Sequence, residues 1–338
     1  MTETKLRWGV ISTANIGRAA VNPAIQASSN GELQAVASRT AAHARDFANQ
    51  WDIPRHYGSY RALLDDPEID AVYIPLPNSK HLEWTKKAAE AGKHVLCEKP
   101  LALNEAECRE MAAAAEDNGV RLLEAFMYRF HPRTQRVLDM VGAGEIGDLR
   151  VIRSSFTFRL TRPDNIRWDP DLGGGSLMDV GCYCVNVSRT MAGAEPLEVQ
   201  AVANWTDRGA DQEMVGTMRF PGGVLAHFDC SLTMERNEIY ELAGTGGHLQ
   251  VPASFLPGKD DAPIHHHRGR EGVTTEVVPG VDEYRLMVEH FADGVLHDRA
   301  FRYTAEEAAL NMRTIEALYR SARDGGRPVT LSANDEGR

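Results

Sequence analysis

Residues 6–17 read LRWGVISTANIG, and this stretch decides the fold of the chain. The apolar run Leu6–Ile11 predicts a strand that is buried on both faces, as strands of parallel sheets are. It passes directly into a tight turn of small residues, and a helical pattern follows over residues 15–27. A strand, a turn and a helix in this order open the α/β folds in which backbone N–H groups at a helix start bind phosphate.

The same alternation of strand and helix patterns continues to residue 125. Further apolar runs predict strands at residues 33–37, 71–74, 95–97 and 121–125, with helical patterns between them. Short connections between alternating strands and helices make the strands parallel and place helices on both faces. We therefore predict a doubly wound Rossmann domain in residues 1–126.

The pattern changes beyond residue 126. A polar loop ends in Gly173–Gly175, and from residue 199 the apolar residues come in short runs separated by Gly, Pro and Asp. Such runs indicate successive antiparallel strands of one sheet. We predict an α+β domain in residues 127–338, with a large, mainly antiparallel open sheet and an amphipathic helix at residues 305–323, and expect it to supply most of the substrate pocket.

The composition is that of a globular protein, with 43% hydrophobic and 25% charged residues. The 37 basic and 48 acidic side chains give a formal charge of -11, which repels nucleic acid and anionic membranes. The chain opens without a secretory signal and has no apolar stretch of membrane-spanning length. We expect a cytoplasmic protein with no nucleic-acid or membrane partner.

Two groups of residues invite a metal interpretation, and we favour neither. The five cysteines are an odd number, and the pair Cys182 and Cys184 has no second pair at ligand spacing, so we expect reduced thiols. Residues 253–272 are predicted to be an irregular, exposed loop. The adjacent His265–His267 in this loop cannot all face one ion. We predict no metal site.

The turn after the first strand is a candidate pyrophosphate site. Compared with the Gly-x-Gly-x-x-Gly fingerprint, only Gly17 is a glycine, and Ser12 and Ala14 occupy the two earlier glycine positions. Serine and alanine are small enough for close approach of a phosphate. The candidate binding residues are Ser12, Thr13, Ala14, Asn15 and Ile16. The alternative is an ordinary turn of an α/β protein.

The end of the second strand indicates which dinucleotide binds. This position normally carries an acidic residue that accepts hydrogen bonds from the adenosine ribose, but here it reads Ser38-Arg39-Thr40. Without a carboxylate, nothing repels a 2′-phosphate, and Arg39 offers a bidentate partner and a stacking plane. These residues favour NADP over NAD. A solvated arginine at a helix start is the alternative.

Two further segments carry candidate chemistry. Glu98-Lys99-Pro100 follows the strand that ends at Cys97, and ligands bind at the carboxyl ends of parallel strands. Pro100 favours extended geometry for Lys99. Asp179 and Tyr183 lie four residues apart, on one face of the helix that follows the glycines. The alternatives are a surface lysine and a capping box formed by Ser176 and Asp179.

In the order in which they occur, these segments resemble the Gfo/Idh/MocA family, named after glucose-fructose oxidoreductase and inositol dehydrogenase. The resemblance covers nearly the whole chain, from Ser12 through Glu98–Pro100 and Glu124–Phe130 to the Gly-rich helix. It is strongest to the branch of NADP-dependent aldose and dihydrodiol dehydrogenases, which carry Tyr where inositol dehydrogenase has His. The loss of two fingerprint glycines departs from the family pattern.

The resemblance implies a catalytic group of Lys99, Asp179 and Tyr183. It also implies cofactor contacts at Pro75, Leu76, Asn78, His81, Glu98, Lys99, Arg167 and Trp168, and we add Arg129 because it follows the last Rossmann strand. An alcohol oxidation needs a group that takes the hydroxyl proton, and Tyr183 is the candidate base. A tyrosine titrates near 10 on its own, so it requires a neighbouring cation such as Lys99. Asp179 would orient the substrate or the lysine.

We therefore predict an NADP-dependent dehydrogenase that acts on a hydroxyl or hemiacetal carbon of a small sugar, foremost an aldose such as D-xylose. A trans-dihydrodiol dehydrogenase and a keto-sugar reductase are the alternatives within enzymes, and a non-catalytic NADP-binding sensor is the alternative from another class. We also expect a homodimer or homotetramer that forms through the C-terminal sheet.

Overall fold

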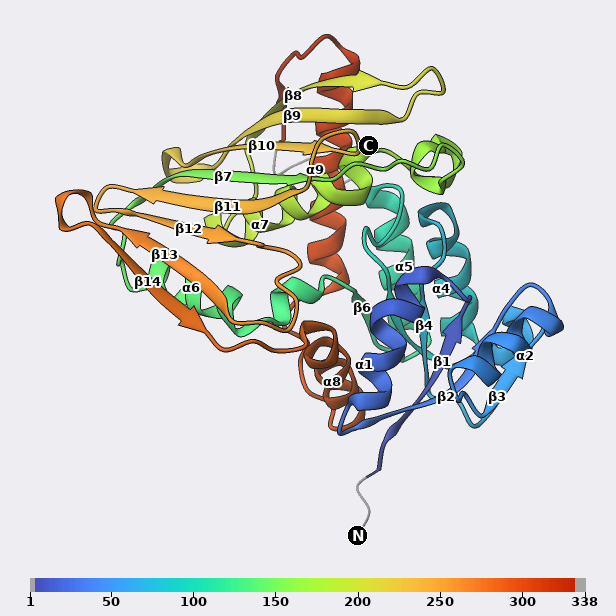
Figure 1. Ribbon diagram of the computed structural model, residues 1–338. Helices are drawn as coiled ribbons and strands as arrows, with labels where there is room; N and C mark the ends of the chain where they lie inside the picture. Colours follow the sequence, from blue (N-terminus) through green and yellow to red (C-terminus); the bar gives the residue numbers. More distant parts are fainter. Residues whose placement is uncertain (1–3, 332–338) are drawn as a thin grey trace. The chain divides into compact units, whose positions relative to one another are not determined.

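The computed structural model describes residues 4–331, which form two compact units (Figure 1). The first unit contains the chain up to Met127 together with Asp282–Ala309, and the second contains Tyr128–Val281 and the described chain from Leu310. Residues 282–309, which the sequence analysis assigned to the second domain, thus pack with the first. They include helix α8 (Glu283–Leu296), whose Phe291 ring lies 5.0 Å from that of Trp8.

A six-stranded parallel sheet forms the centre of the first unit, as predicted. Its order is β3-β2-β1-β4-β5-β6, and the strands are β1 (Leu6–Ile11), β2 (Gly31–Ala37), β3 (Arg55–Tyr57), β4 (Ala71–Ile74), β5 (His94–Cys97) and β6 (Leu122–Glu124). The strand order reverses between the neighbouring strands β1 and β4. In doubly wound sheets, ligands bind outside the carboxyl ends of the strands at such a switch point.

Helices connect these strands, and their bounds are α1 (Asn22–Ala27), α2 (Ala41–Gln50), α3 (Tyr60–Leu64), α4 (His81–Glu90) and α5 (Glu105–Asp117). In a parallel sheet, each connecting helix begins near the carboxyl edge and runs back to the amino edge. The loops of the first unit that carry predicted cofactor residues therefore share one edge of its sheet.

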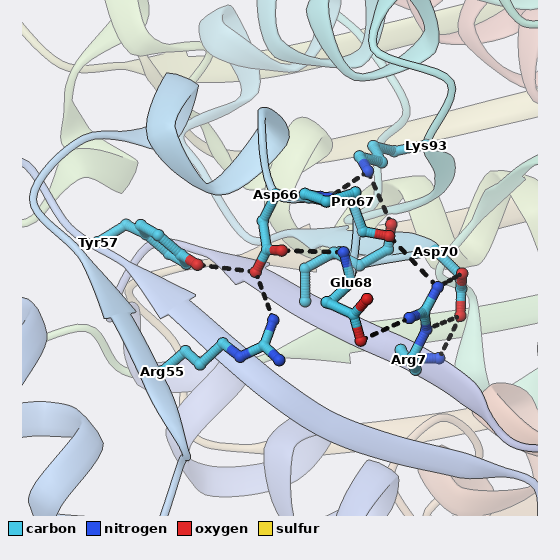
Figure 2. A network of polar contacts seen from close by, with 9 residues as sticks. Arg7, Arg55, Tyr57, Asp66, Pro67, Glu68, Asp70 and Lys93 are labelled. Atoms are coloured by element: carbon cyan, nitrogen blue, oxygen red, sulfur yellow. Dashed lines mark hydrogen bonds and ion pairs between the residues drawn. The ribbon is translucent and has the colours of Figure 1, made fainter.

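A polar network holds the turn that precedes β4 (Figure 2). The Asp66 carboxylate accepts hydrogen bonds from Arg55 at 2.9 Å and from the Tyr57 hydroxyl at 2.7 Å. Lys93, directly before β5, donates to the backbone carbonyls of Asp66 and Ile69 at 2.7 and 2.8 Å. Burial lowers the pKa of Lys93. The network joins β3 and the residue before β5 to the turn before β4.

The second unit contains a nine-stranded sheet in the order β14-β13-β12-β11-β7-β10-β9-β8-β15. All neighbouring strands are antiparallel except β7 and β10, which confirms the predicted mainly antiparallel sheet. The strands are β7 (Leu149–Thr157), β8 (Glu198–Trp205), β9 (Asp211–Arg219), β10 (Leu225–Ser231), β11 (Asn237–Gly244), β12 (His248–Pro252), β13 (Ala262–His267), β14 (Val273–Val278) and β15 (Val329–Thr330).

Three long helices accompany this sheet, α6 (Pro132–Gly142), α7 (Cys182–Ala192) and α9 (Ala305–Arg323), and the first residues of α9 belong to the first unit. Val202 of β8 and Val215 of β9 are paired across the strands, and both are more than half exposed. The oligomer expected through this sheet stays a prediction. Within residues 4–331, no helix is both long enough and apolar enough to cross a bilayer.

The histidine run does not lie in an exposed loop, so that prediction was wrong. His265–His267 belong to β13, His266 is 3% exposed, and the His267 ring stacks on that of His248 at 4.1 Å. The strand forms because it pairs with β12 and β14, and such cross-strand pairing outweighs a weak local propensity.

Candidate active site

The turn after β1 keeps a glycine-like backbone without the glycine. Ser12 has a φ of 125°, a value that glycine adopts readily and other residues rarely do. Its hydroxyl donates to the Pro75 carbonyl at 3.3 Å and accepts from the Ala14 N–H at 3.2 Å. These bonds stabilise the unusual conformation at the first fingerprint position and tie the loop after β1 to the loop after β4.

The helical segment beyond this turn begins at Gly17, and a polar side chain lies beside it. Asn22 is 1% exposed, and neither polar atom of its amide has a hydrogen-bond partner among the described residues. A Cβ added at Gly17 would lie 3.4 Å from the Asn22 Oδ1. A buried amide without partners is costly, so unused hydrogen-bonding capacity lies next to the turn. Small residues, a helix start and this capacity fit the pyrophosphate of a dinucleotide.

The loop after β2 presents a cation and a helix start. Ser38 is buried, and the Thr40 hydroxyl accepts from the His43 N–H at 3.3 Å, which caps α2. Arg39 is exposed between them, and the first turn of α2 has no acidic residue. An exposed guanidinium beside a helix N-terminus suits a phosphate group. Thr40 serves first as a helix cap.

The loop after β5 is held on both sides of Lys99. The Glu98 carboxylate accepts a 2.5 Å hydrogen bond from the hydroxyl of the fully buried Tyr73, and burial raises the pKa of that tyrosine. On the other side, the Leu101 N–H donates at 2.7 Å to Glu124, which is 2% exposed. Glu98 and Lys99 themselves are partly exposed at the carboxyl end of β5.

His81 lies behind two of these loops instead of facing a ligand. Its side chain is completely buried, with Nε2 2.9 Å from the Leu76 carbonyl oxygen and Nδ1 3.1 Å from that of Pro100. A side chain without exposed surface does not touch a cofactor, which argues against the predicted contact. Burial is also the main reason that the pKa of His81 is lowered.

The other cofactor residues predicted in the first unit lie on the loops after β1 and β4. Asn15 is exposed, Pro75 is buried, and Thr13, Ile16, Leu76 and Asn78 are partly exposed. Because the sheet is parallel, the structure gathers the loops after β1, β2, β4 and β5 at one edge.

In the second unit, a buried carboxylate caps the helix that carries Asp179 and Tyr183. Asp211 is 1% exposed and accepts from the Ser176 hydroxyl at 2.6 Å, the Leu177 N–H at 2.7 Å and the Tyr319 hydroxyl at 2.7 Å. Gly175 has a φ of 116°, and a Cβ there would lie 2.0 Å from the Asp211 Oδ1. Ser176 makes no side-chain cap bond of its own, so the capping-box alternative does not describe this helix start.

Asp179 pairs with an arginine from the preceding loop. Its Oδ2 accepts a 2.6 Å hydrogen bond from the Nε of Arg167, and the Asp179 side chain is 14% exposed. Arg167, predicted as a cofactor residue, thus has a carboxylate partner within its own unit. The indole N–H of the neighbouring Trp168 donates to the Arg162 carbonyl at 3.1 Å. Arg129 is partly exposed and also belongs to the second unit.

Tyr183 lies in an aromatic cluster at the start of α7. It is 4% exposed, and its ring centroid lies 5.2 Å from that of Phe255, 5.3 Å from that of Phe156 and 6.0 Å from that of Tyr128. Apolar rings lower the local dielectric constant, so electrostatic interactions of the phenol are stronger than in water.

Sequence reasoning missed the roles of Asp211, Glu124 and Tyr73. Asp211 lies 35 residues from Ser176 in the sequence, and the Tyr73 and Glu98 pair is separated by 25 residues. No local pattern shows these pairs. The only available signal was that Glu124 is an acidic residue at the end of an apolar strand.

A doubly wound parallel sheet with a phosphate-type turn at its carboxyl edge is the arrangement that binds dinucleotides. Residues 6–126 match the oxidoreductase family with an NAD-binding Rossmann fold, and residues 134–250 match the GFO/IDH/MocA C-terminal domain. The chain belongs to the Gfo/Idh/MocA oxidoreductase family, whose matching members are dehydrogenases and reductases that act on CH–OH groups.

Three relatives match between 75% and 95% of the chain. It is 41% identical to D-xylose 1-dehydrogenase (NADP(+)) 2 of Haloferax volcanii over 95% of this chain and 98% of that protein. It is 36% identical to trans-1,2-dihydrobenzene-1,2-diol dehydrogenase of Mus musculus over 75% of this chain and 76% of that protein. Among solved structures, KijD10, a 3-ketoreductase from Actinomadura kijaniata in complex with NADP and TDP-benzene, matches with a TM-score of 0.90. It is 31% identical and covers 94% of this chain and 98% of its own.

Proposed function

We propose that this chain is an NADP-dependent dehydrogenase that oxidises the hemiacetal carbon of a small aldose, such as D-xylose, to the lactone. The observation that carries the proposal is the 41% identity, over 95% of the chain, to an NADP-dependent D-xylose 1-dehydrogenase. The exposed Arg39 and the absence of a carboxylate from the Ser38–Thr40 loop support NADP as the cofactor.

The cofactor supplies the redox chemistry, because its nicotinamide accepts a hydride from the substrate carbon. The residues of this chain bind the cofactor, orient the substrate and accept its proton. The turn Ser12–Ile16 binds the pyrophosphate and Arg39 the 2′-phosphate, while the loop at Leu76 and Asn78 lines the cofactor.

The proton of the substrate hydroxyl passes to the phenolate oxygen of Tyr183 as the C–H bond breaks. The ammonium of Lys99 stabilises negative charge on the substrate oxygen and on the phenolate. Asp179, held by Arg167 at 2.6 Å, orients the sugar by accepting from one of its hydroxyl groups. In this assignment Arg167 lies on the substrate side of the proposed site, whereas the sequence analysis predicted that it contacts the cofactor.

A keto-sugar reductase is the second candidate, because the 3-ketoreductase KijD10 matches the fold with a TM-score of 0.90. The same residues serve both directions, since the base of an oxidation is the acid of the reverse reduction. A trans-diol substrate is the third candidate, through the similarity to the mouse dihydrodiol dehydrogenase.

A substrate panel tests the proposal. Pentoses, hexoses and trans-dihydrodiols are offered with NADP, and keto-sugars are offered with NADPH, while NADPH absorbance is followed. We expect NADPH to form with an aldose of the xylose type. Turnover with keto-sugars alone would establish the reductase, and turnover with diols alone the diol dehydrogenase. NADP binding without turnover on any member would favour the sensor and contradict the proposal.

Cofactor preference gives a prediction for Arg39. We expect the native protein to bind NADP at least about tenfold more tightly than NAD, because Arg39 pairs with the 2′-phosphate. Arg39→Asp should narrow or invert this ratio, since a carboxylate repels the phosphate and accepts from a free ribose hydroxyl. Fluorescence titration of both cofactors measures it.

Arg45→Asp is the matched control, because Arg45 lies in the middle of α2, outside the Ser38–Thr40 loop, and its side chain is 59% exposed. It makes the same change of charge without altering the loop, and the ratio should stay at the native value. Equal affinities of the native protein for NADP and NAD would rule out the assigned role of Arg39.

A further inference from the structure

One buried imidazole joins two loops of the proposed cofactor and catalytic site. His81, the first residue of α4, has no exposed surface. Its Nε2 lies 2.9 Å from the carbonyl oxygen of Leu76, in the loop after β4. Its Nδ1 lies 3.1 and 3.2 Å from the carbonyl oxygens of Pro100 and Leu101, in the loop after β5. Each ring nitrogen therefore faces a different loop.

All three partners are carbonyl oxygens, which only accept hydrogen bonds. The ring must therefore donate, and a neutral imidazole has one N–H while the protonated ring has two. Burial and the charge of Lys99 favour the neutral ring, whereas the carbonyl oxygens favour the charged one. The neutral ring therefore donates to one loop at a time, through Nδ1–H or through Nε2–H, and only the protonated ring donates to both loops at once.

The loop after β5 is the one that carries Lys99. Its other anchors are the 2.7 Å bond from the Leu101 N–H to Glu124 and the 2.5 Å bond from Tyr73 to Glu98. His81 completes the set because it binds carbonyl groups directly after Lys99. The backbone on both sides of Lys99 is thus set by buried side chains, and small displacements of a reacting group lower rates strongly.

We propose that His81 is a positioning residue, which lies between the Lys99 loop at Nδ1 and the Leu76 loop at Nε2 and donates to one or the other, without touching cofactor or substrate. The inference rests on the function proposed above, because it assumes that Lys99 acts in turnover and that the Leu76 loop lines NADP. It replaces the cofactor contact that the sequence suggested for His81.

Two amide variants test the contact at Nδ1 and the contact at Nε2 separately. His81→Asn retains an N–H near the position of Nδ1, and His81→Gln retains one near that of Nε2. We expect His81→Asn to keep turnover within about threefold and to weaken NADP binding about fivefold, the worth of one lost hydrogen bond. We expect the opposite for His81→Gln, with turnover lowered about tenfold and NADP affinity nearly native. His81→Leu should lose both.

His94→Asn is the control, because His94 lies at the other end of β5 and its Nδ1 accepts from the Arg121 N–H at 2.9 Å. It should lower thermal stability without changing turnover or NADP affinity. Melting temperatures of all variants show that each is folded in the assay.

Steady-state kinetics and NADP titration of the His81 variants test the proposal. The crossed pattern of the Asn and Gln variants supports positioning, because a purely structural role would move stability alone. Equal losses in both amide variants and in His81→Leu, or no loss in any of them, would overturn the proposal. NADP titration needs no substrate. A native protein that turns over none of the substrates would contradict the proposed function, while the NADP affinity of His81→Asn would still test the contact between Nε2 and the Leu76 loop.

Discussion

Tyr183→Phe is expected to lower turnover by about a hundredfold or more, which is the usual contribution of a positioned acid–base group. The substitution keeps the ring and therefore its packing against Phe156 and Phe255, at 5.3 and 5.2 Å between centroids. It removes only the oxygen that accepts the substrate proton. NADP affinity should stay close to native, because other residues make the proposed cofactor contacts.

Tyr240→Phe is the matched control for this prediction. Tyr240 is 1% exposed, its ring lies 6.4 Å from that of Phe255, and its hydroxyl has no hydrogen-bond partner among the described residues. Deleting this hydroxyl should leave turnover unchanged. Near-native turnover in Tyr183→Phe would mean that Tyr183 only packs and that the proton passes to Lys99 or to water.

Lys99→Ala is expected to lower turnover to a similar extent and also to weaken NADP binding. The ammonium stabilises charge on the substrate oxygen, and the loop on which it lies lines the cofactor in the proposed site. The difference from Tyr183→Phe is therefore the loss of affinity. Steady-state kinetics and NADP titration on the same preparations measure both effects.

Lys80→Ala controls for the loss of one positive charge near the same edge of the sheet. Lys80 directly precedes α4, its side chain is 52% exposed, and it forms an ion pair with Glu83 at 3.5 Å. Lys80→Ala should change neither turnover nor NADP affinity. If Lys99→Ala bound NADP normally and turned over at the native rate, Lys99 would be a surface residue, as its loop position alone would suggest.

The sequence predicted the Rossmann sheet well because its strands are apolar on both faces. Strand β1 was predicted at its observed bounds, Leu6–Ile11. Strand β3 was missed because Arg55–Tyr57 is polar and only partly buried, so it has no apolar run. The strand β13 was missed because its histidines are ordered by pairing with neighbouring strands, which local composition does not reveal.

In the candidate site, too, local features could be predicted from the sequence, whereas long-range contacts could not. Loops that follow strands could be predicted, because Gly, Pro and polar turn residues in the local sequence mark where a loop lies. The groups that hold these loops could not be predicted, since they are distant in sequence. Ser176 and Asp179 resembled a local cap, but Asp211 caps that helix from another strand. His81 resembled a ligand contact, yet its partners are carbonyls of two loops.

The central claim is that a hydride passes from the hemiacetal carbon of an aldose to NADP on this protein. The most direct measurement uses D-xylose deuterated at that carbon, native protein and NADP, with mass spectrometry of the recovered NADPH and of the sugar product. We predict that NADPH carries one deuterium, that the product is the unlabelled lactone, and that turnover is slower than with unlabelled sugar. NADPH without deuterium, or a deuterated sugar recovered unchanged after long incubation, would contradict the account.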